Sequence, residues 1–419
     1  MPAQFQTPPG TRDVLPPESG RWEDLVARFA TLARGSGFGL IINPMFEDIG
    51  VFRPVGDSTD IVRKEMYDFR DKGDRHLALR PEGTASVARA FVQHRPTPPW
   101  KTWYVGPNFR YDKPQSGRYR QHHQVGVEAI GTADPDLDVE VISLASTFLV
   151  ELGLRDVRLD LNSNGDPECK PALREAMFGF LDARVDQLCD DHREHYRLNP
   201  MRVLDCKRRA CRDATKHAPR MIDHLCEPCA THFTHVRSGL DALGIAYEIN
   251  TRLVRGQDYY TRTTFELAPA ASDSSQNALG GGGRYDGLVE VLGGPPTPGI
   301  GFGLGIERIL EAREEAGAAP PPVPSLVEVF VVDTTGGLQA AALVHELRAA
   351  GVATDRAYDS KSMKAQFKAA DRSGAHYALI VGEDERAEGT VTVRDLRGGQ
   401  EQTKVDRSKV VDEMRMKVS

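Results

Sequence analysis

The sequence is poor in cysteine and has no long hydrophobic run, and both absences restrict the kind of protein that it can encode. Six cysteines in 419 residues are too few for a disulfide scaffold of this size, which favours reduced thiols in the cytoplasm. No stretch reaches the roughly 18 apolar residues that a membrane-spanning helix needs. The N-terminus has no positive region followed by an apolar core, so we expect a cytoplasmic protein without secretory signal or membrane anchor.

The chain also lacks a strong excess of charge of one sign. Its 53 Lys and Arg against 60 Asp and Glu give a formal net charge of −7. With 40% hydrophobic and 27% charged residues, the composition is typical of a soluble globular protein. It excludes a mostly disordered chain, a collagen-like chain and an unselective nucleic-acid coat protein, but it is compatible with a local basic surface.

The length predicts two or three domains. A Pro/Ala-rich stretch at 314–325 reads as a semi-rigid linker. After it, β-branched runs alternate with a helical segment at 338–350, which indicates a small α/β domain with a parallel or mixed sheet at 326–419. Before it, two strand-rich segments flank a helical, cysteine-bearing block at about 165–240, which we interpret as an insertion between two strands.

Two strands, 103–110 and 118–130, are predicted around a loop at 112–117. Because residues two apart in a strand share a face, Gln124 and Glu128 point one way with Gly126 between them, and the apolar residues between them point the other. The polar face suits a small polar ligand. The alternative is a hairpin with one solvated face.

A similar polar group surrounds Pro81. Arg80, Glu82 and Thr84 share parity, and Pro81 limits the segment to the end or edge of a strand. Thr84 also begins a predicted helix, so the group could bind an ammonium ion or serve only as a helix cap.

Two glycine patterns follow. The run 280–283 would let the backbone approach a ligand closely, although a flexible surface loop is the alternative. Glycine at every second position of 299–305 leaves one bare strand face on which a flat ring could lie, or against which a helix could pack. Arg308 then opens the next helix, close enough to stack on that ring or to contact phosphates.

Residues 253–260 add one guanidinium, one carboxylate and two phenols. Together these segments resemble the histidyl-tRNA synthetase family of class II aminoacyl-tRNA synthetases. Residues 109–121 resemble motif 2 of the class, 301–308 resemble motif 3, and 39–47 with the preceding helix resemble the dimer-forming motif 1. The segments 253–260 and 280–288 resemble the two histidine-specific boxes.

The resemblance implies an α+β catalytic domain with an antiparallel sheet of the class II synthetase type at 1–325. This domain would bear the helical insertion and precede an α/β anticodon-binding domain at 326–419. The implied reaction is the ATP-dependent attachment of histidine to tRNA(His) through histidyl-adenylate, by a homodimer, with ATP as substrate and Mg²⁺ beside the outgoing phosphates.

The resemblance also implies roles for individual residues. Arg110 and Arg255 would bracket the α-phosphate and act in catalysis, and Asp112 and Arg308 would complete the ATP site. In the histidine site, Glu128 and Tyr260 would take the ring, Glu82, Thr84 and Gln124 the α-amino end, and Tyr259 would lie with them. Asp112 replaces the usual Glu, and Gln257 replaces the usual Leu.

Two other functions are alternatives to this enzyme activity. Chains of this resemblance also serve as non-catalytic regulatory subunits of ATP phosphoribosyltransferase, and a tRNA-binding module without catalysis is a third possibility. Both predict losses among the arginines, the histidine boxes or the last domain. This chain keeps them, which favours the enzyme.

Three further features bear on tRNA and metals. Eight basic side chains within 196–220 could clamp phosphates: Arg197, Arg202, Lys207, Arg208, Arg209, Arg212, Lys216 and Arg220. In the last domain Lys361, Lys364, Lys368 and Arg372 fall at helical spacing, which also fits a solvated helix face. Cys206, Cys211, Cys226 and Cys229 are spaced so that they could bind one structural zinc ion. The spacing alone does not identify any of them as a metal ligand.

Overall fold

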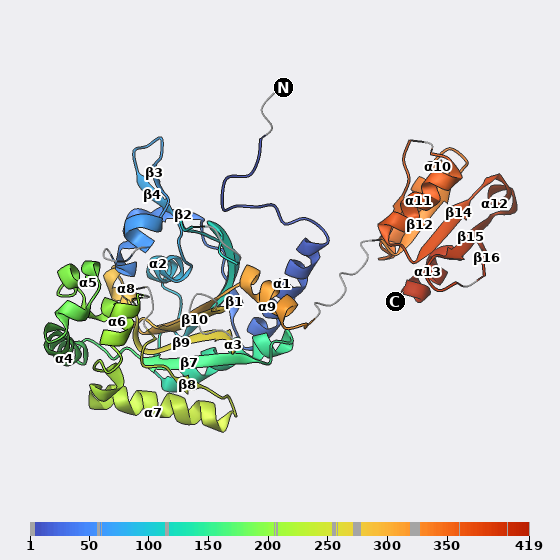
Figure 1. Cartoon of the computed structure of the whole chain (residues 1–419). Coiled ribbons are helices and arrows are strands. Elements are labelled where there is room, and N and C mark those ends of the chain that lie inside the picture. Colours follow the sequence, from blue (N-terminus) through green and yellow to red (C-terminus); the bar gives the residue numbers. More distant parts are fainter. Residues whose placement is uncertain are drawn as a thin grey trace. The chain divides into compact units, whose positions relative to one another are not determined.

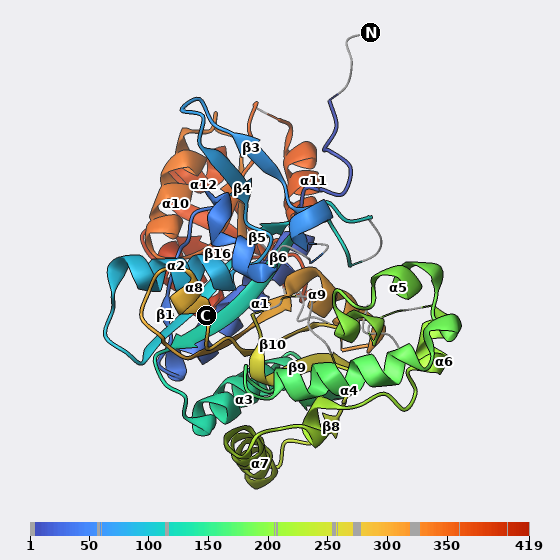
Figure 2. The same ribbon diagram turned by 90° about the vertical axis from the view of Figure 1, so that its left-hand side faces the viewer.

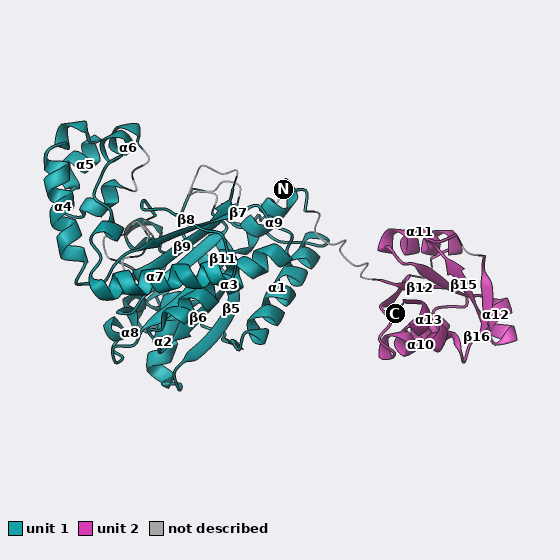
Figure 3. Ribbon diagram, turned by 90° about the horizontal axis from the view of Figure 1, so that it is seen from below, with its two compact units in different colours: residues 1–321 teal, residues 322–419 magenta. Residues whose placement is uncertain are grey.

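The structure is a computed structural model that divides into two compact units, residues 1–321 and 322–419 (Figure 3). It describes residues 5–56, 59, 61–113, 117–204, 206, 208–253, 257, 259–270, 278–318, 327–359, 361–399 and 401–418. The division falls within the stretch predicted as a linker. Helix α9 (Ile306–Glu315) nevertheless includes the first two residues of that stretch, because glutamates favour helix and the breaking residue comes only at Gly317, which has a φ of +62°.

Unit 1 is organised around a sheet of eight described strands in the order β1-β5-β6-β11-β10-β9-β7-β8 (Figure 1). All neighbours are antiparallel except β1 with β5 and β7 with β8, so the predicted antiparallel sheet is confirmed. The strands are β1 (Gly39–Leu40), β5 (Trp100–Phe109), β6 (Gln121–Ile130), β7 (Val157–Ser163), β8 (Glu248–Ile249), β9 (Thr261–Pro269), β10 (Gly280–Arg284) and β11 (Gly299–Gly305).

One face of this sheet carries the main core. Alternate residues of β6 and β11, including Val125, Val127, Phe302 and Leu304, are at most 2% exposed and pack under helices. The helices on this face are α1 (Glu18–Gly35), α3 (Pro135–Glu151), α7 (Glu227–Ala242) and α9. Since these side chains take the core face, Gln124 and Glu128 of β6 must lie on the other face, as the strand period predicted.

The opposite face is covered only in part. Helix α2 (Thr84–His94), the short α8 (Leu288–Val291) and a turn of π-helix at Ile61–Glu65 border it. A small antiparallel sheet in the order β2-β4-β3 joins them, made of β2 (Phe46–Asp48), β3 (Asp68–Arg70) and β4 (His76–Leu79). No helix among the residues that the structure describes is long and apolar enough to cross a membrane.

The helical block begins after β7 and returns to the sheet at β8, which pairs with one side of β7 at Asp160 opposite Glu248. Strand β9 then pairs with the other side of β7, with Ser163 opposite Thr263. This is the arrangement of an insertion between adjacent strands. Its helices are α4 (Lys170–Asp182), α5 (Asp190–His195), α6 (Arg209–Ala214) and α7. Helices α4, α5 and α6 lie together at one side of unit 1 in every view (Figures 1, 2 and 3). Helix α7 instead packs against α3.

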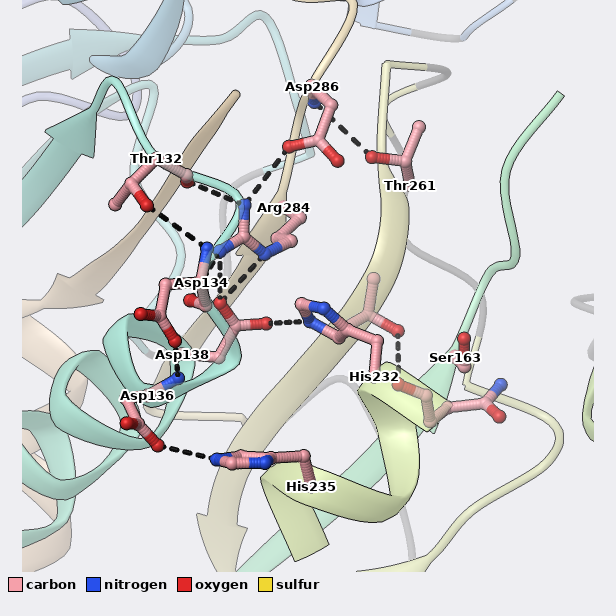
Figure 4. Close-up of polar contacts among 12 residues, drawn as sticks. Thr132, Asp134, Asp136, Asp138, Ser163, His232, His235, Thr261, Arg284 and Asp286 are labelled. Carbon is pink, nitrogen blue, oxygen red and sulfur yellow. Dashed lines mark hydrogen bonds and ion pairs between the residues drawn. The ribbon is translucent and has the colours of Figure 1, made fainter. Parts of the chain in front are cut away.

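A buried ionic network ties β10 to two helices (Figure 4). Arg284, at the end of β10, is 0% exposed and forms an ion pair of 2.7 Å with Asp138 of α3. The same carboxylate contacts Nε2 of His232 on α7 at 2.8 Å. Arg284 also donates to the carbonyl oxygen of Thr132 and to Asp286. The carboxylate of Asp138 therefore links α3 to Arg284 at the end of β10 and to His232 on α7.

Unit 2 is an α/β unit with its own core. Its sheet has the order β13-β12-β14-β15-β16, in which β13, β12 and β14 are parallel and the last two pairings are antiparallel. The mixed sheet is therefore confirmed. The elements are β12 (Val329–Asp333), α10 (Leu338–Ala349), β13 (Thr354–Arg356), α11 (Met363–Ser373), β14 (Tyr377–Val381), α12 (Glu383–Glu388), β15 (Thr390–Asp395), β16 (Thr403–Asp406) and α13 (Val410–Val418).

Candidate active site

A cavity of about 890 Å³ lies on the polar face of the large sheet. Residues from the sheet, from α2, from the loop after β5 and from the insertion line it. Among the predicted site residues, the lining includes Glu82, Thr84, Arg110, Asp112, Gln124, Tyr259, Tyr260 and Arg308. Segments that are as much as 226 positions apart in the chain (308 − 82) therefore meet at one cavity.

Glu128 lies buried beside the cavity wall, with 0% exposure. The Thr84 hydroxyl donates to Oε1 of Glu128 at 2.6 Å, and the Tyr285 hydroxyl donates to Oε2 at 2.6 Å. The Tyr104 hydroxyl lies 3.4 Å from Oε1. Burial raises the pKa of Glu128 to about 8, more than these donors lower it. The protonated form of this carboxyl group is therefore favoured at neutral pH.

The alternating glycines of β11 make room for Glu128. Gly301 is the register partner of Glu128, and a β-carbon on Gly301 would lie 1.9 Å from its Oε2. Gly303 faces the side chain of Gln124, at 3.2 Å from such a β-carbon. The predicted bare strand face is therefore real, and the nearest group that fills it is a carboxylate rather than a helix.

The four-glycine run is not a surface loop. Residues 280–283 form most of β10, which lies between β9 and β11 inside the sheet. A β-carbon on Gly282 would lie 1.9 Å from the carbonyl oxygen of Gly301. The glycines do allow a close approach of the backbone, but the group that approaches β10 is the backbone of the neighbouring strand β11.

Glu82 is a second buried carboxylate at the cavity. Its carboxylate accepts the backbone N–H groups of Thr84 and Ala85 at 2.7 and 2.8 Å, so it caps α2 as well as lining the cavity. The Tyr259 hydroxyl donates to Glu82 at 3.3 Å. The ring of Tyr260 lies 4.9 Å from that of Tyr259, and burial raises the pKa of Glu82. Glu82 therefore caps α2 and also lines the cavity.

Two arginines supply positive charge to the cavity. Arg110 donates from Nε to the carbonyl oxygen of Pro81 at 2.8 Å, and Arg308 donates to the carbonyl oxygens of Gly117 and Ala278 at 3.2 and 2.5 Å. Burial lowers the pKa of each guanidinium below its ordinary value. An arginine still keeps its proton at neutral pH, so both are poorly solvated cations that an anionic ligand would stabilise.

Asp112 follows Arg110 in the loop after β5. Its carboxylate accepts the backbone N–H of Lys113 at 2.7 Å and forms an ion pair of 3.1 Å with Arg118. Arg118 also lines the cavity. Asp112, which is one methylene shorter than the usual Glu, is therefore paired with Arg118.

The sequence comparisons agree with this geometry. Residues 10–309 match the family model for histidyl-tRNA synthetase, and residues 328–417 match that for an anticodon binding domain. The chain belongs to the histidyl-tRNA synthetase family.

Named relatives and solved structures of the family match nearly the whole chain. Proteins called histidine–tRNA ligase from Moorella thermoacetica and Desulforudis audaxviator are 49% and 48% identical, with 97% of this chain covered in each case and 96% and 98% of the relatives. The structure of apo histidyl-tRNA synthetase from S. aureus covers 98% of this chain and 100% of its own, with a TM-score of 0.83 and 34% identity.

One catalytic prediction lies outside the described residues. Arg255 belongs to the first histidine-specific box, of which the structure describes Leu253, Gln257, Tyr259 and Tyr260. Leu253 and Gln257 line the cavity together with the two tyrosines. The replacement of the usual Leu by Gln257 therefore falls on the cavity wall.

Sequence reasoning missed two residues that line the cavity, Tyr104 and His122, and one that contacts Glu128, Tyr285. Tyr104 lies opposite Gly126 in the pairing of β5 with β6, and Tyr285 follows the glycine run. His122 has the parity of Gln124 and Glu128, and burial with the nearby charges of Arg110 and Arg308 lowers its pKa to about 3. Strand parity would have found His122. Tyr104 requires the pairing register, which the sequence does not contain.

The four cysteines of the predicted zinc window do not form one cluster. Cys206 and Cys211 lie with Cys189 and His192, whereas Cys226 and Cys229 lie with Cys169 and Asp166. Sequence spacing grouped the wrong residues because Cys169 and Cys189 lie earlier in the chain and are brought in by the fold.

The basic residues of the insertion are spread over several environments. Arg212 lines the cavity, Arg197 pairs with Asp182 at 2.6 Å, and Arg209 lies 3.5 Å from Asp213. Lys207 lies outside the described residues. In unit 2 the predicted basic stripe at 361–372 is exposed, and Phe367 on its helix packs against the core.

Proposed function

We propose that this chain attaches histidine to tRNA(His) in two steps, first forming histidyl-adenylate and pyrophosphate from histidine and ATP. The observation that carries the proposal is the single cavity where a buried carboxylate–hydroxyl group and two poorly solvated arginines meet. Amino-acid activation needs both, because one end of the cavity must select a side chain and the other must bind phosphates.

Histidine selection would fall to Glu128 and Tyr260 at the ring. An imidazole offers two nitrogens, and a site that pairs both rejects analogues that leave a buried group unpaired. An oxygen of Glu128 can accept a hydrogen bond from an imidazole N–H. Glu82, Thr84 and Gln124 would bind the α-amino end, with Tyr259 holding Glu82. The Asn108 amide donates to Gln124 at 2.7 Å, which fixes the orientation of its side-chain amide.

Phosphate chemistry would fall to Arg110 and Arg255, with Arg308 and Asp112 on the ATP side. A carboxylate that attacks a phosphate is repelled by it, and guanidinium groups around the α-phosphate offset that repulsion and the charge that grows in the transition state. Mg²⁺ fits the chemistry of the lining, since Glu266 provides carboxylate oxygens in the same cavity and would hold the ion together with phosphate. The ion would neutralise charge on the outgoing phosphates.

For tRNA, we assign residues 1–325 to the catalytic domain and 326–419 to the anticodon-binding domain. Arg202, Arg208, Arg212, Lys216 and Arg220 of the insertion would contact phosphates of the acceptor arm. The exposed basic stripe of Lys361, Lys364, Lys368 and Arg372 is a candidate surface for the anticodon arm.

We also propose that the chain acts as a homodimer through motif 1. The segment around β1 and β2 exposes several large apolar side chains in a row: Leu40, Ile42, Met45 and Phe46, which are 49%, 87%, 51% and 53% exposed. Apolar groups gathered in this way support burial against a second copy.

The test is exchange of labelled pyrophosphate into ATP with each of the twenty amino acids. We expect exchange with histidine alone, and loss of at least about 100-fold in Arg255→Ala, which is the scale of removing one transition-state donor. Arg237→Ala, on the exposed side of α7, is the control and should exchange normally. A regulatory subunit would show no histidine-dependent exchange, and normal exchange by Arg255→Ala would show that its role is wrongly assigned.

A further inference from the structure

We propose that the helical insertion holds two structural zinc ions, one bound by Cys189, His192, Cys206 and Cys211 and the other by Asp166, Cys169, Cys226 and Cys229. All six cysteines of the chain belong to these two groups, three in each. In each group the four ligand atoms lie within 4.8 Å of one another. The proposal is independent of the proposed reaction.

The first group has the geometry of a tetrahedral site. Zinc bonds of about 2.3 Å to sulfur and 2.0–2.1 Å to nitrogen put the two ligand atoms about 3.5 Å apart. Nδ1 of His192 lies 3.3 Å from Sγ of Cys189 and 3.7 Å from Sγ of Cys211. The backbone N–H of Cys189 also donates to Sγ of Cys211 at 3.2 Å, a contact that stabilises a metal-bound thiolate.

The second group repeats this arrangement at the two ends of the insertion. Sγ of Cys226 lies 3.6 Å from Oδ2 of Asp166, close to the same expected separation of about 3.5 Å. The backbone N–H of Cys226 donates to Sγ of Cys169 at 3.1 Å. Asp166 is held by the backbone N–H groups of Glu168 and Cys169 at 3.0 and 3.1 Å. Arg262, 4.0 Å from Asp166, would offset negative charge around the ion.

The spacing along the chain is that of structural zinc ligands. Each group uses two pairs, and the ligands in a pair are three or five positions apart: 189 with 192, 206 with 211, 166 with 169, and 226 with 229. Short spacings of this kind are typical of zinc sites, and thiolates with imidazole or carboxylate in tetrahedral geometry select zinc over harder cations.

The insertion also needs such an anchor. Helices α5 and α6 have six residues each, too short to be stable alone, and the residues Cys189 and Tyr196 that flank α5 join α6 in one small apolar cluster. Cys169, Cys189, Cys211 and Cys229 lie buried within that cluster. The second site would join the start of the insertion to α7, and the first would fix α5 to α6.

Metal content of the full-length protein, purified without chelators and dialysed briefly against EDTA, tests the proposal. We expect about two zinc ions per chain, and about one in either Cys206→Ala or Cys226→Ala. Two matched controls should keep both ions: His195→Ala, on the same helix as His192 but exposed, and Glu227→Ala, exposed beside Cys226. Fewer than two ions in the unmodified protein, another metal, or equal loss in a control overturns the proposal.

A second measurement covers variants that fail to fold. Unmodified protein produced in cobalt-supplemented medium should show thiolate-to-cobalt charge-transfer absorption and the visible bands of tetrahedral cobalt. A mercurial thiol reagent should release the metal in proportion to the thiols it modifies. Absence of the bands, or cysteines found as disulfides in the freshly purified protein, counts against both sites.

Discussion

At the residue scale, Glu128 shows how one position combines opposite demands. Its carboxyl group has no exposure to solvent, yet both oxygens have hydroxyl partners. Burial disfavours the charged form, and the hydroxyl donors favour it. Burial prevails, so the neutral acid is favoured at neutral pH.

The raised pKa of Glu128, about 8, predicts a pH dependence of stability. Between its unfolded pKa, about 4.3, and about 8, the folded protein holds a proton that the unfolded chain releases. The free energy of unfolding should therefore fall as pH rises through this window. In Glu128→Gln this contribution is absent, so the unfolding free energy of the unmodified protein minus that of Glu128→Gln should decrease steadily from pH 5 to 8 in denaturant titrations.

The comparison with Glu128→Gln isolates this group from others. Buried His122 contributes with the opposite sign at lower pH, because its pKa of about 3 lies below the unfolded value, but it is present in both proteins. The same variant should raise the KM for histidine far more than that for ATP. A stability difference that does not change with pH would contradict the assignment of a raised pKa to Glu128.

At the element scale, the role of β11 depends on the side chains that its glycines lack. Its glycines leave space on the site face, and its alternate residues Ile300, Phe302 and Leu304 fill the core on the other. Strand period alone predicted both faces. It could not predict which group would occupy the space, because the pairing of Gly301 with Glu128 depends on strand order and register rather than on local pattern.

Gly301→Ala should therefore damage both stability and histidine use. The new β-carbon would meet Oε2 of Glu128 and the carbonyl oxygen of Val127, at 1.9 and 2.4 Å without relaxation. We expect a loss of about 1–3 kcal/mol in unfolding free energy, the usual cost of overpacking. Denaturant titration and exchange kinetics measure the two effects.

Gly305→Ala is the matched control in the same strand. Its β-carbon would come no closer than 3.6 Å to any other group, and its φ of −78° suits alanine. Equal damage from the two substitutions would mean that β11 requires glycine for its backbone and not for the space beside Glu128.

At the scale of the whole molecule, the sequence predicted the order of its parts better than their contacts. The linker, the mixed sheet of unit 2 and the insertion are visible as changes in composition and period. The grouping of the cysteines and the network of Arg284, Asp138 and His232 join residues up to 146 positions apart, and no local pattern encodes such a pairing. Arg255, named only by resemblance, remains a prediction because it lies outside the described residues.

The two units have separate cores, which predicts separable activities. None of the apolar clusters of the described residues mixes residues of unit 1 with residues of unit 2. A chain ending at residue 318 should fold and keep histidine-dependent pyrophosphate exchange within a few-fold, while charging of tRNA(His) falls steeply. Circular dichroism and the two assays on the same preparation measure this, and loss of exchange in a well-folded truncated chain would refute it.

The insertion leaves the large sheet after β7 and re-enters it at β8, which pairs with β7 on the side opposite β9. Its entry and exit are therefore fixed by the sheet whatever lies between them. Because Leu204, Cys206 and Arg212 of the insertion line the same cavity, a change in the length of the insertion would also change one wall of the candidate site.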